Sequence, residues 1–164
     1  MNTATTQSLD PRSLRHTFAA VPTGVALTAG TLDDAPVGLL TNSFATISLD
    51  PPLVSISFDL SSTSWPRLRT VKKAGISILS EDNEETAALL RRPTAERFDD
   101  IDVEGRGGSA LFIPGAAAKL EVELEEVIEA GDHHLTLWRV LSHERRPDAT
   151  PLVFYDSTMA PLAI

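Results

Sequence analysis

Residues 38–64 read GLLTNSFATISLDPPLVSISFDLSSTS, and this stretch decides the fold and points toward a function. Hydroxyl and amide side chains lie at both ends of an otherwise β-rich unit, and neither end contains a paired charge. Because such groups donate and accept hydrogen bonds, the stretch predicts a polar pocket that binds a ligand. Serine is also a common turn residue, so ordinary turn chemistry is the alternative.

The second half of the stretch indicates that the ligand carries phosphate. A helix is predicted from Thr63 or Ser64 through Lys73, and the N–H groups at a helix N-terminus bind phosphate. Arg67 or Arg69 would add positive charge there, and a capped helix with ordinary surface arginines is the alternative. The residues that we expect to bind the ligand are Leu40, Thr41, Asn42, Ser43, Ser57, Phe58, Asp59, Leu60, Ser61, Ser62, Thr63, Ser64 and Arg67.

The composition is that of one ordinary folded domain. Of the 164 residues, 42% are hydrophobic and 23% are charged, which indicates neither a disordered protein nor a membrane protein. The sequence contains no cysteine, which excludes disulfides, thiolate metal sites and thiol nucleophiles. The net charge of −9 argues against nucleic acid as a partner, because phosphate neutralisation drives most such binding.

The ends of the sequence suggest where the domain lies and where the protein is found. We expect residues 1–10 to form a flexible tail and residues 11–164 to form a single domain. The first residues lack the charged and apolar segments of a signal peptide. No apolar run approaches the roughly 20 residues that cross a bilayer. We therefore expect a cytoplasmic protein with no membrane partner.

The hydrophobic pattern predicts a mainly β fold with inserted helices. Asp10 and Pro11 begin a helix that Pro22 ends, residues 81–92 form another helix, and the glycine-rich residues 99–115 form a long loop. Strands are predicted at residues 24–29, 37–40, 44–49, 53–58, 75–79, 117–128, 134–140 and 152–155. Because strands and helices do not strictly alternate, a barrel is favoured over a doubly wound sheet.

Two adjacent histidines follow the Gly131-Asp132 turn and suggest a reactive site. Neighbouring strand residues point to opposite faces, so His133 and His134 cannot bind one ion, and we expect no metal site. A Gly-x-Ser-x-Gly elbow, which a hydrolase triad would need, is absent. His133 beside Asp132 is the candidate catalytic residue, as a proton or charge partner near a bound cofactor. The alternative is a surface histidine in a turn.

In order and spacing, these motifs resemble the flavin reductase family, the small FMN-binding split β-barrel proteins that supply reduced flavin to monooxygenases. The resemblance rests on the Asn-Ser-Phe and Asp-Pro-Pro block, the Ser/Thr cluster, the Gly131-Asp132-His133 turn and the closing strand at 151–155. The typical Arg-Phe pair of the family appears as Arg97-Phe98 and joins the expected cofactor-binding residues.

The resemblance implies a function as well as a fold. It implies non-covalent FMN, with FAD also possible, and NADH or NADPH as the co-substrate that reduces it. It places His133 near the flavin and the nicotinamide. It further implies a homodimer with flavin sites at the subunit interface, and a partner oxygenase that receives the reduced flavin.

Three positions depart from the family pattern. Ser77 stands where asparagine is common, Trp138 where glycine is common, and Met159 near a common tyrosine. Strand alternation directs Trp138 away from His133, and we expect it at a subunit contact. The departures leave two alternatives open. One is a flavin-binding carrier or sensor with little turnover. The other is a split-barrel oxidoreductase that uses a deazaflavin or reduces an organic substrate directly.

Overall fold

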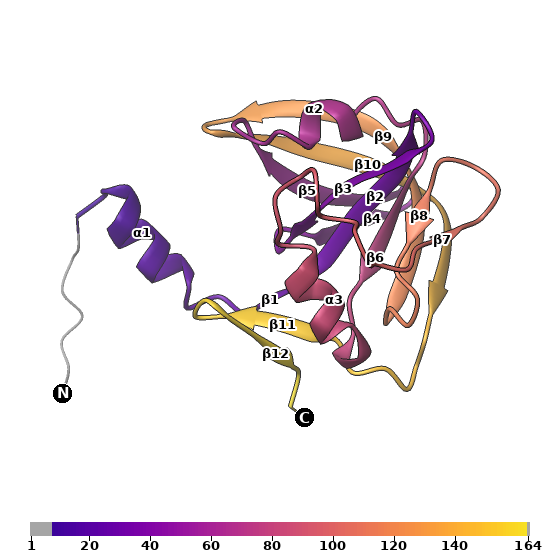
Figure 1. Ribbon diagram of the computed structural model, residues 1–164. Coiled ribbons are helices and arrows are strands. Elements are labelled where there is room, and N and C mark those ends of the chain that lie inside the picture. The colour runs from indigo at the N-terminus through magenta and orange to yellow at the C-terminus, as the bar shows by residue number, and fades with distance from the viewer. Residues whose placement is uncertain (1–7, 164) are drawn as a thin grey trace.

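The structure, a computed structural model, describes residues 8–163 (Figure 1). Residues 1–7 of the expected tail, and Ile164, lie outside the described residues. The helices are α1 (Pro11–Phe18), α2 (Trp65–Leu68) and α3 (Glu84–Leu89), with the 3₁₀ turn η1 at Glu81–Asn83. The strands are β1 (Thr23–Gly24), β2 (Ala26–Leu32), β3 (Ala35–Thr41), β4 (Ala45–Leu49), β5 (Pro52–Asp59), β6 (Ala74–Ile78), β7 (Glu104–Gly105), β8 (Leu111–Phe112), β9 (Ala118–Ala130), β10 (His133–Arg145), β11 (Leu152–Tyr155) and β12 (Thr158–Pro161).

Seven strands form one antiparallel sheet in the order β3-β2-β6-β9-β10-β5-β4. The sheet curls round an apolar interior, because Val37 near one edge and Val54 near the other pack in the same buried cluster. The edge strands β3 and β4 follow each other in the chain but are not neighbours in the sheet. The barrel is therefore open between β3 and β4, which residues 42–44 connect. The predicted mainly β fold with inserted helices is confirmed.

Alternate side chains of β2 face two separate apolar cores. Ala26 faces the barrel interior, whereas Leu27 and Ala29 face the outside of the sheet, which α3, β8 and β11 cover. Such alternation is expected for a strand that is buried on both faces. The outer layer lies very close to the sheet at Gly75 of β6, where an added Cβ would lie 2.2 Å from the carbonyl oxygen of Leu111.

Tight turns with left-handed backbone conformations join the hairpins. Asp33 and Asp34 connect β2 to β3 with φ of 52° and 60°, and Gly131, with φ of 64°, begins the turn from β9 to β10. Asp156 and Ser157 connect β11 to β12 with φ of 46° and 64°. The sequence predicts the turn between β9 and β10 but misses β12, because Asp-Ser is a weaker turn signal than Asn-Gly or Asp-Gly.

The helix predicted from residue 64 through Lys73 is too long, because α2 ends at Leu68. Val71 is 5% exposed, so the chain must turn inward at that point. The N–H of Lys73 donates to the hydroxyl of Ser109 at 3.0 Å instead of to a helix carbonyl. Tertiary contacts therefore override the local helix preference of this segment.

Two further sequence predictions need correction. The predicted helix over residues 81–92 is divided into η1 and α3 and ends at Leu89. The expected loop at 99–115 contains the short strands β7 and β8, because Leu111 and Phe112 are buried against the sheet.

The helix α1 stands apart from the barrel (Figure 1). As predicted, Asp10 caps it, and one carboxylate oxygen accepts the N–H groups of Arg12 and Ser13 at 3.0 Å each. None of its residues is buried, and Phe18 is 65% exposed. Among residues 8–163, no helix is long and apolar enough to cross a membrane.

Candidate functional site

A cavity of about 490 Å³ lies against the end of the edge strand β3. Segments from β3, from the chain after α3 and from the β11–β12 hairpin line it with Val25, Leu39, Leu40, Thr41, Asn42, Leu90, Arg91, Arg97, Phe154 and Met159. The structure thus brings together Leu40, Thr41, Asn42 and Arg97 from the predicted binding residues. Sequence reasoning missed most of the other lining residues, and of these only Met159 stood out, as a departure from the family pattern.

Two buried polar atoms in this cavity wall have no hydrogen-bond partner within residues 8–163. They are Thr41 Oγ1 and Arg97 Nε, whereas a third such atom, Thr28 Oγ1, belongs to a residue outside the lining. An unpaired buried polar group costs about 1–3 kcal/mol. Burial lowers the pKa of the Arg97 guanidinium, but arginine stays protonated in proteins. The wall therefore carries a fixed positive charge, and two of its buried polar atoms lack a hydrogen-bond partner.

Arg97 connects two segments that lie far apart in the sequence, the edge strand β3 and the start of α2. Its Nη1 donates to the carbonyl oxygen of Gly38 in β3 at 2.9 Å and to the hydroxyl of Ser64 at 2.7 Å. The hydroxyl of Thr94 lies 3.2 Å from that of Ser64 and 2.8 Å from that of Thr63. Arg97, which lines the cavity, thus links β3 to the start of α2, although Ser64 itself does not line the cavity.

Ser43 has a structural role where the barrel splits. Its Oγ donates to the carbonyl oxygen of Ser57 at 3.1 Å and accepts the N–H of Ser57 at 3.0 Å. These two bonds continue the pairing of β4 with β5 on the N-terminal side of β4, which starts at Ala45. Asn42, in contrast, lines both the main cavity and a neighbouring cavity of about 450 Å³ beneath α1.

Hydrogen bonds inside the turn after β5 occupy much of the second predicted cluster. The carboxylate of Asp59 accepts the hydroxyl of Ser61 at 2.6 Å and its N–H at 2.7 Å, and these bonds lower the pKa of Asp59. Ser62 Oγ accepts the N–H groups of Ser64 and Trp65 at 3.3 and 3.1 Å. Because these N–H groups are already partnered and α2 has four residues, a helix N-terminus is not available for phosphate.

The remaining predicted binding residues do not line the main cavity. Phe58 is buried in the barrel and stacks on Trp65 with ring centroids 4.3 Å apart. Phe98 packs against the outer apolar cluster. Leu60 and Arg67 lie on the exposed surface beside them.

His133 begins β10 and lies opposite Asp59 of β5. Its Nδ1 is 2.7 Å from a carboxylate oxygen of Asp132. His134 contacts a different element, since its Nδ1 accepts a hydrogen bond from Trp65 in α2. His133 therefore lies beside the Asp59–Ser61 turn and outside the lining of the main cavity. Among residues 8–163, no three His, Cys, Asp or Glu side chains form a group that could hold a metal ion.

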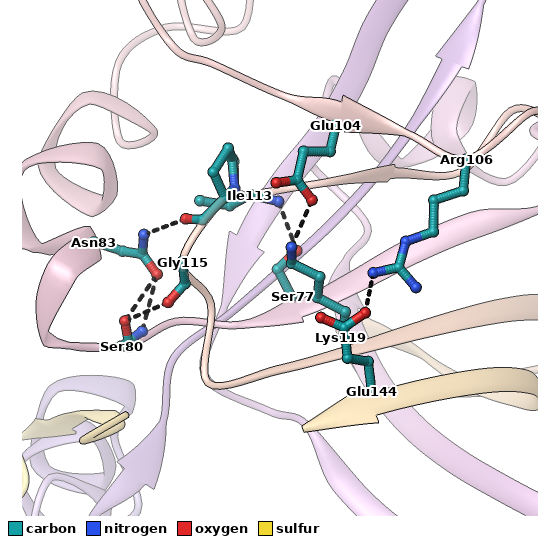
Figure 2. A network of polar contacts seen from close by, with 10 residues as sticks. Ser77, Ser80, Asn83, Glu104, Arg106, Ile113, Gly115, Lys119 and Glu144 are labelled. Atoms are coloured by element: carbon teal, nitrogen blue, oxygen red, sulfur yellow. Dashed lines mark hydrogen bonds and ion pairs between the residues drawn. The ribbon is translucent and has the colours of Figure 1, made fainter. Parts of the chain in front are cut away.

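Figure 2 shows Ser77, which stands where asparagine is common in the family, beside the backbone of Ile113. The Ser77 hydroxyl is fully buried and accepts the N–H of Ile113 at 3.0 Å, which fixes the chain after β8 on β6. The same view shows Ser80, which donates to the carbonyl oxygen of Gly115 at 2.7 Å, and Asn83, which accepts the N–H of Ser80 at 3.1 Å. None of these residues lines the main cavity.

The expectation that Trp138 lies at a subunit contact is wrong. The side chain is 0% exposed and faces the barrel interior, the same side of β10 as Thr136. Its Nε1 donates to Thr136 Oγ1 at 2.7 Å, and that hydroxyl donates to the carbonyl oxygen of Ile56 at 2.7 Å. Every polar atom of the indole is therefore satisfied inside the core.

Residues 18–163 match the model of the flavin reductase like domain. The chain belongs to this family. A probable flavin reductase of Rhizobium meliloti strain 1021 is 36% identical over 142 residues, which are 85% of this chain but only 45% of that protein. The chain thus spans about half the length of this relative. The FMN reductase (NADH) SmoA of Agrobacterium fabrum is 36% identical over 143 residues, 87% of this chain and 81% of that protein.

The chain is also similar to a solved flavin reductase structure and to the reductase subunit of a monooxygenase. The NADH:FAD oxidoreductase SgcE6 of Streptomyces globisporus C-1027 has a TM-score of 0.89 and 29% identity, with 99% of each chain covered. That protein is also solved in complex with NAD and FAD fragments. The monooxygenase reductase subunit HsaB of Rhodococcus jostii is 32% identical over 150 residues, 91% of this chain and 76% of that protein. The predicted family and its split-barrel fold are therefore confirmed.

Proposed function

We propose that this chain is an NAD(P)H:flavin oxidoreductase that binds FMN or FAD and supplies reduced flavin to a partner monooxygenase. The observation that carries the proposal is the pair of buried, unpaired atoms, Thr41 Oγ1 and Arg97 Nε, in one cavity of a flavin reductase family member. The activity predicted from the sequence agrees with the names of relatives that reduce FMN or FAD with NADH.

The cavity wall has the chemistry that a flavin requires. Phe154 and Met159 offer apolar contact to a planar ring, while Thr41 and Asn42 offer donors and acceptors to its polar edge. Arg97 offers positive charge to an anionic group. When bound, the flavin supplies the chemistry of accepting a hydride from the nicotinamide. The protein binds and orients the two reactants and excludes water from between them.

The other predicted cofactor-binding residues would either bind the phosphate or support the site. The turn from Asp59 to Ser64 would receive the phosphate through its hydroxyl groups, and Arg67 would add charge from α2. Ser43, Ser57, Phe58, Leu60 and Phe98 would shape the site from behind, since the first three hold β4, β5 and α2 together.

The structure weakens the argument for a carrier or sensor with little turnover. That alternative depends on the departures at Ser77 and Trp138, and both residues are buried, hydrogen-bonded parts of the core that do not line the cavity. Only Met159 among the three departures lies in the cavity wall. The proposed reductase is therefore favoured.

Steady-state oxidation of NADH and NADPH, with and without added FMN, FAD or riboflavin, tests the proposal. We expect oxidation that depends on added flavin. Under anaerobic conditions we expect NADH to remove the visible absorption of the oxidised flavin. Flavin binding without either change would identify a carrier, and an extractable deazaflavin would identify the other alternative; each result would refute the proposed reductase.

His133 is proposed to orient the nicotinamide. Because His133 is proposed only to orient the nicotinamide, His133→Ala should leave a working enzyme with a KM for the nicotinamide about three- to tenfold higher, the value of one hydrogen bond. The FMN dissociation constant should stay unchanged, since His133 does not line the main cavity. Steady-state kinetics and flavin titration of the same variant measure both quantities. Unchanged kinetics, or a matching loss of FMN affinity, would remove this role.

We also propose a cytoplasmic homodimer that binds neither nucleic acid nor membrane and whose single domain spans residues 11–164. Exposed apolar side chains near the cavities support the dimer, because Phe18, Val21 and Tyr155 are 65%, 61% and 54% exposed. Phe18 and Val21 line the second cavity, which shares Asn42 and Phe154 with the first. Sedimentation analysis should give twice the chain mass, and a monomer at micromolar concentration would contradict this proposal.

A further inference from the structure

The short helix α2 depends on Trp65 for its position. A helix of four residues is not stable on its own, so tertiary contacts must hold it. Trp65 is 2% exposed. Its ring stacks on Phe58 of β5 with centroids 4.3 Å apart, and it meets the ring of Trp138 edge-on with centroids 6.3 Å apart. In Figure 1, α2 accordingly lies close over the barrel strands.

The indole N–H of Trp65 has one acceptor, which is His134. Trp65 Nε1 lies 2.9 Å from His134 Nδ1, 69 positions further along the chain. Because an indole nitrogen can only donate, His134 Nδ1 is the acceptor of this hydrogen bond. Loss of the acceptor would leave a buried donor unpaired, which is costly.

Trp65 is connected through its neighbour Ser64 to Arg97, which lines the cavity. Its backbone N–H and that of Ser64 donate to Ser62 Oγ at 3.1 and 3.3 Å. The hydroxyl of Ser64 in turn accepts from Arg97 Nη1 at 2.7 Å. A shift of Trp65 would therefore move the hydroxyl groups of the turn and the guanidinium of Arg97.

We propose that His134 is a positioning residue: by accepting the Trp65 N–H it holds the Ser62–Ser64 turn and, through Ser64, Arg97 in place for the anionic group of the cofactor. The inference rests on the proposed binding of flavin. It assigns different tasks to the two neighbouring histidines. His133 would act on the nicotinamide, whereas His134 would act on cofactor affinity through α2.

Binding of FMN and riboflavin to a set of variants tests this proposal. His134→Ala removes the acceptor, and Trp65→Phe removes the donor but keeps a ring for stacking on Phe58. Each variant should bind FMN about three- to tenfold more weakly, with riboflavin affected much less, because only FMN carries the phosphate. The double variant should lose no more than either single variant, because both changes break the same bond.

Conservative rescue separates positioning from general stability. His134→Asn can place an amide oxygen near the position of Nδ1 and should restore FMN affinity to within about twofold. His143→Ala, an exposed histidine on the same strand, is the matched control and should leave both affinities unchanged. Equal losses for FMN and riboflavin, additive losses in the double variant, or no rescue by asparagine would each overturn the proposal. Wild-type protein that binds no flavin would instead refute the proposed function.

Discussion

Trp138→Ala should lower the free energy of unfolding by about 3–5 kcal/mol, the range for truncating a large buried aromatic side chain. The indole is 0% exposed in the barrel interior, and its ring centroid lies 6.3 Å from that of Trp65. Its loss therefore opens a cavity between β10 and α2. It also removes the donor to Thr136 Oγ1. Denaturant unfolding of the wild type and the variant measures the difference.

Two variants define what this result would mean. Trp138→Phe keeps much of the volume but loses the N–H, and we expect it to cost about 1 kcal/mol, the value of one hydrogen bond, plus a smaller packing loss. Leu141→Ala changes a 41% exposed residue of the same strand and should stay within about 1 kcal/mol of the wild type. A Trp138→Ala protein as stable as Leu141→Ala would show that the indole is not a core residue.

The sequence predicts the barrel strands well because their signal is local. Alternation of apolar and polar residues specifies β5 and β9, and the Gly131-Asp132 turn specifies the hairpin between β9 and β10. The helix predicted through Lys73 fails because its end depends on the burial of Val71, a contact with the core that no local pattern contains.

The candidate site is only partly predictable for the same reason. Thr41 and Asn42 stand in a polar motif, and Arg97 is found through its family resemblance. That Arg97 bridges Gly38 and Ser64, 59 and 33 positions away, appears only in the fold. Equally, no spacing rule pairs Trp65 with His134. The sequence places the two histidines on opposite faces of a strand, but it does not show that His134 accepts from Trp65 while His133 lies beside Asp132.

Arg97→Ala should weaken FMN binding about ten- to a hundredfold, the usual value of a hydrogen bond to a charged group. The change removes the guanidinium from the cavity wall, and it also leaves the Gly38 carbonyl oxygen and the Ser64 hydroxyl without their shared donor. Riboflavin, which lacks the phosphate, should lose less affinity than FMN. Fluorescence titration of both flavins at low salt measures the two losses.

Two further variants, Arg91→Ala and Arg97→Lys, show whether FMN affinity depends on the hydrogen bonds of Arg97 or only on positive charge in the cavity wall. Arg91→Ala removes an arginine from the same cavity wall but leaves the two bonds made by Arg97, so we expect a loss below about fivefold for FMN. Arg97→Lys keeps the charge without the planar fork and should fall between the wild type and Arg97→Ala. If Arg91→Ala is as damaging as Arg97→Ala, net charge alone binds the anion, and the bridge from β3 to α2 has no part in cofactor affinity. If lysine restores wild-type affinity, the paired contacts to Gly38 and Ser64 are likewise dispensable.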